Sequence, residues 1–135
     1  MARPVPPADI LLKLLGAPYQ TELITSALRL TQALLDRGAR VQVWACGEAT
    51  RLTWAGLGEA KPRHFGDWER EYPSPPAVVR GLLEGYPDRL HWYVCGFCCD
   101  ERGTGDQIAR VRRRPLTRFA DHVRAAGKSL SLGVA

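Results

Sequence analysis

The first hydrophobic pattern along the chain is a short, nearly continuous apolar run at residues 9–16 (DILLKLLG). A run of this length without polar alternation is typical of a strand that is buried on both faces of a parallel sheet. From Thr21 the apolar residues recur at helical spacing, with Thr21 placed as the N-cap and Gly38 just after the last turn. We therefore predict a strand over residues 9–16 and a helix over residues 22–37.

The alternation then changes to that of a strand at residues 39–47 (ARVQVWACG), which end at Cys46 and Gly47. Strand, helix and strand in succession predict a βαβ unit with a right-handed crossover. A short helix is expected over residues 48–54. Glycines and prolines interrupt residues 55–76, so these residues are expected to form a loop.

A further strand is predicted at residues 90–94 (LHWYV), because aromatic and β-branched residues favour strands. This strand delivers Cys95 at its carboxyl end. The remaining expected elements are a helix over residues 77–86, a helix over residues 116–125 that stops at Gly127, and a last strand over residues 129–134.

Strands that alternate with helices indicate an α/β fold. We expect a single-domain, three-layer, Rossmann-like α/β sandwich over residues 1–135, with a mostly parallel sheet of four or five strands. Residues 1–8 are expected to be a flexible N-terminal segment. Ligands in such folds bind beyond the carboxyl ends of the strands. Cys46 and Cys95 each end a predicted strand, so all four cysteines are expected at one edge of the sheet.

The composition limits where the protein is expected to reside and which partners it is expected to bind. No secretory signal or long apolar span is visible, so we expect a cytoplasmic protein that does not insert in membranes and whose cysteines are reduced. The formal net charge is +5, and part of it lies in one block, RVRRRP, at residues 110–115. The favoured interpretation of this block is a solvated loop and helix start, with a docking surface as the alternative. Nucleic acid is not an expected partner, because no aromatic residue is interleaved for base stacking.

The stretch VCGFCCDERG, residues 94–103, contains three of the four cysteines of the chain. A closed zinc site takes four Cys or His ligands, usually in two pairs, and only one Cys-x-x-Cys is present. A disulfide between Cys98 and Cys99 is unfavourable, since adjacent α-carbons lie about 3.8 Å apart. A Cys95–Cys98 pair is geometrically easier and is a known redox arrangement. Asp100 and Glu101 are expected in a solvated turn.

A third possibility is a nucleophilic thiolate at Cys95. Free N–H groups of a following turn, and Arg102 if it folds back, would favour the charged form of this sulfur. The alternative is that the cysteines are small buried apolar residues, an interpretation that fits Cys46 best, Cys99 less well and Cys95 least. The sequence motifs of common hydrolases, nucleotide-binding proteins and dinucleotide-binding proteins are missing.

Two stretches, residues 16–44 (GAPYQTELITSALRLTQALLDRGARVQVW) and residues 94–103, resemble the DsrE family of sulfur-relay proteins, which includes the TusD and DsrE subunits. In this resemblance Cys95 takes the place of the persulfide-bearing cysteine. Arg102 and Gly103 take the place of the family's Arg-Gly pair. Tyr19 matches the tyrosine of a turn that helps to shape the pocket.

The resemblance implies a Rossmann-like sandwich, a cysteine that receives and passes on sulfane sulfur, and assembly into homo- or hetero-oligomers such as dimers, trimers or hexamers. Cys98 and Cys99 are additional to a single active cysteine. A persulfide on Cys95 is therefore open to resolution by Cys98 as a disulfide.

The leading hypothesis is a sulfur carrier, sulfurtransferase-like if active, that exchanges sulfur with donor and acceptor proteins and needs neither a cofactor nor a metal. Cys95 attacks the donor with support from Arg102, Cys98 is the resolving thiol, and Cys46, with Cys99 and Gly103, lines the site. One alternative is a soft-metal site for Zn or Cu(I) made of these cysteines. The other is a non-catalytic assembly subunit that uses its arginine block.

Overall fold

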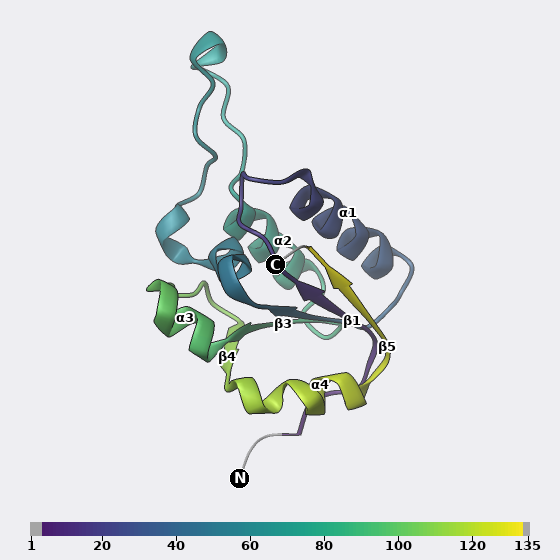
Figure 1. Cartoon of the computed structure of the whole chain (residues 1–135). Coiled ribbons are helices and arrows are strands. Elements are labelled where there is room, and N and C mark those ends of the chain that lie inside the picture. The colour runs from purple at the N-terminus through teal and green to yellow at the C-terminus, as the bar shows by residue number, and fades with distance from the viewer. Residues whose placement is uncertain (1–3, 134–135) are drawn as a thin grey trace.

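Five parallel strands form the central sheet of the structure, a computed structural model that describes residues 4–133 (Figure 1). They lie in the order β4-β3-β2-β1-β5, and each neighbouring pair is parallel. The expected α/β class with a mostly parallel sheet is confirmed. In chain order the strands are β1 (Ala8–Leu14), β2 (Val41–Ala45), β3 (Leu90–Cys95), β4 (Val111–Arg114) and β5 (Ala126–Leu132).

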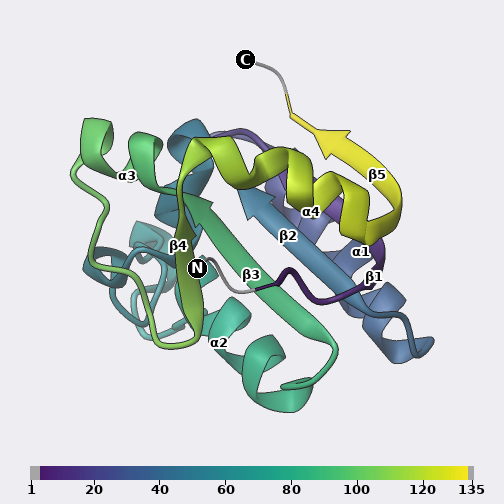
Figure 2. The same ribbon diagram turned by 90° about the horizontal axis from the view of Figure 1, so that it is seen from below.

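Helices cover both faces of this sheet, so the three layers are present. Helices α1 and α2 lie on one face and α4 lies across the other, as the two views show (Figures 1 and 2). Within residues 4–133 no helix combines the length and the apolar character needed to cross a membrane. The α-helices are α1 (Glu22–Asp36), α2 (Pro75–Gly85), α3 (Gly96–Arg102) and α4 (Phe119–Ala125), and the 3-10 helices are η1 (Gly47–Thr53), η2 (Ala55–Leu57), η3 (Phe65–Asp67) and η4 (Leu116–Arg118).

The sheet separates two apolar cores. Leu12 and Leu14 of β1 belong to the main core, on the side of α1 and α2, while Leu11 belongs to a smaller core with Trp44 and Tyr93. All three leucines are completely buried. The apolar run at the start of the chain is therefore a strand with two buried faces, as its composition predicts.

Helix α1 begins and ends close to its sequence signals. The hydroxyl of Thr21 accepts a hydrogen bond from the backbone N–H of Leu23 at 3.1 Å, which is the expected N-cap. The helix ends at Asp36, and Gly38 follows with a φ of +90°, a conformation that favours glycine. Its buried face packs against the sheet through Ile24, Ala27, Thr31 and Leu35.

Both chain ends depart from the expectation. Residues 1–3 lie outside the described residues, but Pro6 accepts a hydrogen bond from the side-chain amide of Gln42, and Ala8 is a buried residue of β1. Pro6 and Ala8 are thus attached to the sheet. Gly127 is not a helix stop: it lies within β5, where a Cβ would approach the Asp9 carbonyl oxygen to 3.1 Å. Val134, in the expected last strand, lies outside the described residues.

The arginine block was expected to be a loop and helix start, and this is wrong. Residues 111–114 form β4, an edge strand whose Arg112 and Arg113 pair with Tyr93 and Val94 of β3. The backbone hydrogen bonds of a neighbouring buried strand outweigh the low strand preference of arginine. Asp100 and Glu101 likewise lie in α3 and not in a turn.

Residues 58–74, which we call the arm, project from the body of the molecule and carry η3 at their far end (Figure 1). Two backbone hydrogen bonds join the two sides of its base, from Lys61 to Tyr72 at 2.8 Å and from Ser74 to Glu59 at 2.9 Å. Helix α2 begins at Pro75, two residues before the predicted start, because Ser74 is its N-cap and proline suits the first helical position. The loop predicted over residues 55–76 contains two short 3-10 helices, η2 and η3.

A buried histidine of α4, His122, packs against the aromatic residues of the smaller core. The Nδ1 atom of His122 lies 2.9 Å from the side-chain oxygen of Gln42, and its ring packs edge-on against Trp44 and Tyr93. Burial, reinforced by the positive charges of Arg114 and Arg118, lowers the pKa of His122 to about 4. The folded protein therefore holds this ring neutral.

The low pKa of His122 predicts that the folded protein loses stability in acid at pH values above those at which most carboxylates titrate. The unfolded chain binds a proton at His122 near its ordinary pKa of 6.5, whereas the folded chain does not until about 4, so stability falls as the pH falls between these values. From pH 7 to pH 5 the free energy of unfolding should drop by about 2 kcal/mol from this group. Denaturant unfolding of wild type and His122→Asn checks this, because Asn keeps a donor for Gln42 but does not titrate. An equal pH slope in both proteins would contradict the assignment.

Candidate functional site

Three cysteines meet at the carboxyl edge of the sheet because of the pairing between β2 and β3. Ala45 is in register with Val94, so the next residues along the chain, Cys46 and Cys95, leave the sheet side by side. Helix α3 starts directly after Cys95, at Gly96. Positions three apart on such a turn face the same side, which brings Cys98 over Cys95.

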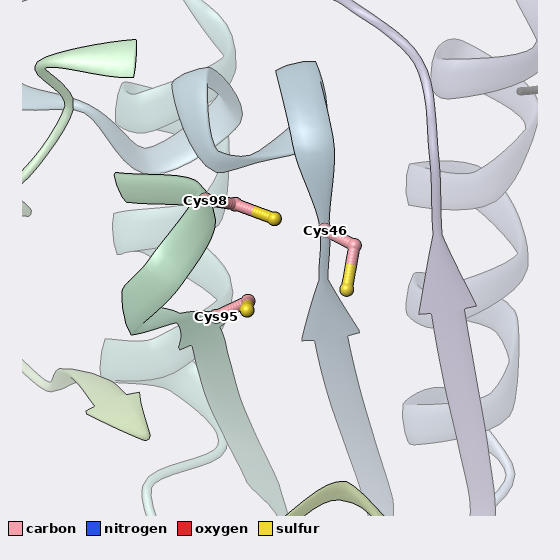
Figure 3. A group of neighbouring side chains, drawn as sticks. All are labelled: Cys46, Cys95 and Cys98. Atoms are coloured by element: carbon pink, nitrogen blue, oxygen red, sulfur yellow. The ribbon is translucent and has the colours of Figure 1, made fainter. Parts of the chain in front are cut away.

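The three sulfur atoms form one compact group (Figure 3). The Sγ atoms of Cys46, Cys95 and Cys98 all lie within 4.8 Å of one another. Figure 3 shows the side chains of Cys95 and Cys98 pointing toward the end of β2 that carries Cys46. We call these three residues the thiol group. It lies at the end of the smaller core, to which Cys95 belongs and against which Cys46 and Cys98 pack.

The fourth cysteine is not part of the thiol group. Cys99 is completely buried in the main core, and its thiol hydrogen-bonds Thr104. Burial raises the pKa of Cys99 despite this hydrogen bond. Cys99 lies in α3, which starts at the carboxyl edge of the sheet, but its thiol enters the main core, because consecutive residues of a helix point in different directions.

Exposure differs within the thiol group. Cys95 has no exposed surface, whereas Cys46 and Cys98 are half-buried. A molecule that approaches from solvent therefore meets Cys46 or Cys98 before it meets Cys95. The sequence placed Cys95 at a strand end but carried no signal for its burial, which depends on α3 and on the smaller core.

Cys46, the first residue after β2, is held by the tryptophan two residues before it. The indole N–H of Trp44 donates a hydrogen bond to the Cys46 sulfur at 3.0 Å. Burial nevertheless raises the pKa of Cys46 to about 11, and the nearby sulfurs of Cys95 and Cys98 contribute in the same direction. Cys46 is therefore a thiol, and not a thiolate, at neutral pH.

Cys98 has a different electrostatic environment. Burial raises the pKa of Cys98, but the backbone N–H of Gly47 and the positive charge of Arg102 act in the opposite direction. Gly47 has a φ of +60°, and a Cβ there would lie 3.8 Å from an Arg102 Nη atom. Glycine at this position lets the chain turn sharply after β2 with the guanidinium close beside it.

Arg102 is fixed by carboxylates from two elements. Its Nε atom lies 3.1 Å from a carboxylate oxygen of Glu48 in η1, and its Nη1 atom lies 3.5 Å from Glu101 in α3. Glu48 also pairs with Arg51, and these hydrogen bonds lower the pKa of Glu48. The expected folding back of Arg102 onto Cys95 is replaced by an ion pair that joins α3 to η1 beside Cys98. Gly103, at φ +66°, ends α3.

Tyr19 lies on another surface. It lines a groove together with residues of α1, α2 and the arm, and burial raises its pKa. Its φ of +68° places it in the left-handed region, so the turn after β1 holds this ring in an uncommon backbone conformation.

Sequence reasoning missed three contributors to the site: Trp44, Gly47 and Glu48. Trp44 had a usable signal, because residues two apart on a strand share a face and Trp44 precedes Cys46 by two. Gly47, directly after a strand end, is the position where a backbone turn commonly needs glycine. The ion pair of Glu48 with Arg102, 54 residues apart in the chain, had no local signal.

Comparison with known proteins defines the fold. No family model and no curated protein sequence matches the chain. Among solved structures, the crystal structure of the YchN protein from E. coli superposes with a TM-score of 0.73 and 23% sequence identity, covering 92% of this chain and 98% of YchN. YchN is a DsrE-like protein of this α/β fold. The chain shares that fold. The similarity extends over nearly the whole described sheet and its helices.

Thiol exposure predicts the order of alkylation in the native protein. Limited iodoacetamide at pH 8, followed by peptide mass analysis, should label Cys98 first and Cys46 more slowly. Cys46 reacts slowly because alkylation requires the thiolate and its pKa is about 11. Cys95 and Cys99 should be protected, with rates at least roughly tenfold below that of Cys98. In denaturant the four rates should converge. Native labelling of Cys95 ahead of Cys98 would contradict the arrangement.

Proposed function

We propose that this chain is a member of the DsrE family and acts as a cytoplasmic sulfur-relay carrier that holds sulfane sulfur as a persulfide in the thiol group. The observation that carries the proposal is the meeting of three sulfur atoms within 4.8 Å at the carboxyl edge of a parallel sheet. Ligand chemistry in such folds occurs at this edge. The resemblance of residues 94–103 to the family's active stretch and the DsrE-like fold of YchN support the same reaction.

The loading step is a thiol exchange. A protein thiolate attacks the outer sulfur of a donor persulfide, R–S–SH, the donor S–S bond breaks, and R–S⁻ leaves with the electron pair. The product is a persulfide on the protein, and neither an oxidant nor a cofactor is consumed. Transfer to an acceptor thiol is the same exchange in the opposite sense. Donor and acceptor are other proteins or small thiols, which approach the thiol group in turn.

Burial favours roles for the thiols that differ from those of the sequence-based hypothesis, in which Cys95 itself attacks the donor. Cys98 is half-buried and lies beside Arg102 and the Gly47 N–H, so it is the thiol that meets the donor. Cys95 then attacks the outer sulfur of the Cys98 persulfide and holds the sulfur where solvent does not reach it. In a second exchange Cys98 takes the sulfur back and presents it to the acceptor. Cys46, protonated at neutral pH, shapes the site.

A disulfide is the other product that this geometry permits. If Cys95 attacks the inner sulfur of a Cys98 persulfide, or Cys98 that of a Cys95 persulfide, a Cys95–Cys98 disulfide forms and hydrosulfide leaves. The electrons balance without an added oxidant. The reaction therefore ends a transfer cycle when no acceptor arrives, and a reductant restores both thiols.

Sulfur loading tests the proposal directly. Each reduced protein is incubated with a small persulfide donor, separated from it by gel filtration, and weighed intact without reductant. Wild type should retain about one sulfur atom, Cys95→Ser should retain far less, and Cys98→Ser should load at least roughly tenfold more slowly. Cys99→Ser is the matched control, because Cys99 lies outside the thiol group, and it should load as wild type does. Full retention of sulfur by Cys95→Ser would overturn the role of Cys95.

A soft-metal site is the second candidate, and the same three sulfurs favour it. Thiolates select Cu(I) and Zn, and a Zn–S bond is about 2.3 Å long, so sulfurs within 4.8 Å of one another can surround one ion. Zinc normally takes a fourth ligand, and Cys99 does not supply it. Metal analysis of protein purified without a histidine tag separates the two functions. The sulfur carrier predicts less than one metal per ten chains, whereas a metal protein retains about one per chain.

The assembly-subunit alternative predicts a buried, unreactive Cys95 and a free arginine block. The burial of Cys95 agrees with this alternative. The arginine block agrees less well, because Arg113 is paired with Asp100 and the Arg114 guanidinium lies 5.3 Å from the ring centre of Tyr93. Sulfur retention by wild type would remove this alternative.

A further inference from the structure

Two large aromatic side chains at the far end of the arm, Phe65 and Trp68, have no core to pack into. Phe65 is 94% exposed and Trp68 is 58% exposed. Phe65 and Trp68 stack on each other, with ring centres 6.1 Å apart. Aromatic residues gathered on an exposed, projecting segment are typical of a surface that another protein covers.

A groove that suits aromatic side chains lies at the opposite end of the arm. It has a volume of about 600 Å³ and runs between α1 and α2. Ile24 and Leu28 of α1 and Val78 and Leu82 of α2 line it. The base of the arm, at Lys61, borders it, so one element carries the aromatic tip and helps to form the groove.

The arm cannot fill the groove of its own chain. Its base is held extended by backbone pairing, including a bridge between Ala60 and Pro73, and its tip points away from α1 and α2 (Figure 1). When two copies lie with their arms side by side and antiparallel, each tip reaches the base of the other arm, where the groove is. Because each copy makes the same contact with the other, the two copies form a closed dimer with twofold symmetry.

The charges that remain unpaired fit this arrangement. Among the described residues, Glu69, next to Trp68 at the tip, has no ion pair, whereas Arg63 and Arg70 are paired within the arm. On the rim of the groove, Arg29 and Lys61 also have no ion pair in the described part of the chain. Their two positive charges outnumber the one negative charge on the rim, that of Glu22, so the rim is positive on balance. The tip therefore offers a free carboxylate and the rim offers free cations.

We infer that the arm tip of one copy inserts Phe65 and Trp68 into the α1–α2 groove of a second copy, so that the protein is a reciprocal, arm-exchanged dimer. This interface is independent of the thiol group: none of Cys46, Cys95 and Cys98 lines the groove. The inference gives Tyr19, which lines the groove, a place at the interface between copies.

Light scattering after gel filtration at tens of micromolar protein tests the inference. Wild type should have the mass of two chains. The double variant Phe65→Ser/Trp68→Ser removes the aromatic side chains of the tip, and Thr25→Arg, at an exposed position of the groove, blocks its entrance. Each should be a monomer with an unchanged circular dichroism spectrum, because the substituted side chains are exposed. Leu116→Ser is the matched control: Leu116 is 57% exposed but lies on η4, away from arm and groove, and this variant should remain a dimer.

Mixing the two monomeric variants sharpens the test. A tip variant keeps an intact groove and a groove variant keeps an intact tip, so the mixture should form heterodimers held by one complete joint. A monomeric wild type, dimers that survive either variant, or a ring of more than two chains would each overturn the reciprocal dimer. If a different protein or a small apolar molecule fills the groove, wild type alone is monomeric, and that result also overturns it.

Discussion

The parallel register between β2 and β3 is the constraint on which the site depends. Both strands are buried on two faces, so a shift of one residue would expose apolar side chains and bury the wrong face. With Ala45 opposite Val94, Cys46 and Cys95 must leave the sheet as neighbours. The sharp turn at Gly47 and the immediate start of α3 then add Cys98 from above. Packing of the core thus holds the three free thiols together.

The two cores explain why neighbouring cysteines differ. Helix α3 lies at the end of the sheet, so Cys99 enters the main core while Cys98 turns toward the smaller one. Cys95 is a member of that smaller core, together with Trp44 and Tyr93. In the proposed sulfur relay, this burial protects a bound sulfur from solvent, and Cys98 is the more exposed thiol that passes the sulfur on. The ion pair of Arg102 with Glu48 joins α3 to η1 beside Cys98.

Most of the fold follows from periodicity, because β1, α1 and β3 carry strong local patterns with recognisable ends. The edge strand β4 does not, since its arginines pair with β3 only after the sheet exists. Helix α3 has seven residues and too few turns to show a helical period. At the site, strand-end positions predicted the meeting of Cys46 and Cys95. The direction of Cys99, the burial of Cys95 and the partner of Arg102 depend on tertiary packing, which a local pattern does not encode.

The most direct measurement of the central claim, that the three thiols act as one sulfur site, is to locate the sulfane sulfur in loaded wild-type protein. Rapid alkylation in a neutral denaturant followed by peptide fragmentation assigns the extra sulfur to individual cysteines at successive times. The account predicts sulfur on Cys98 at the earliest times, then on Cys95, with none on Cys99. Sulfur that stays on Cys98 alone, or is spread equally over all four cysteines, would contradict a shared site.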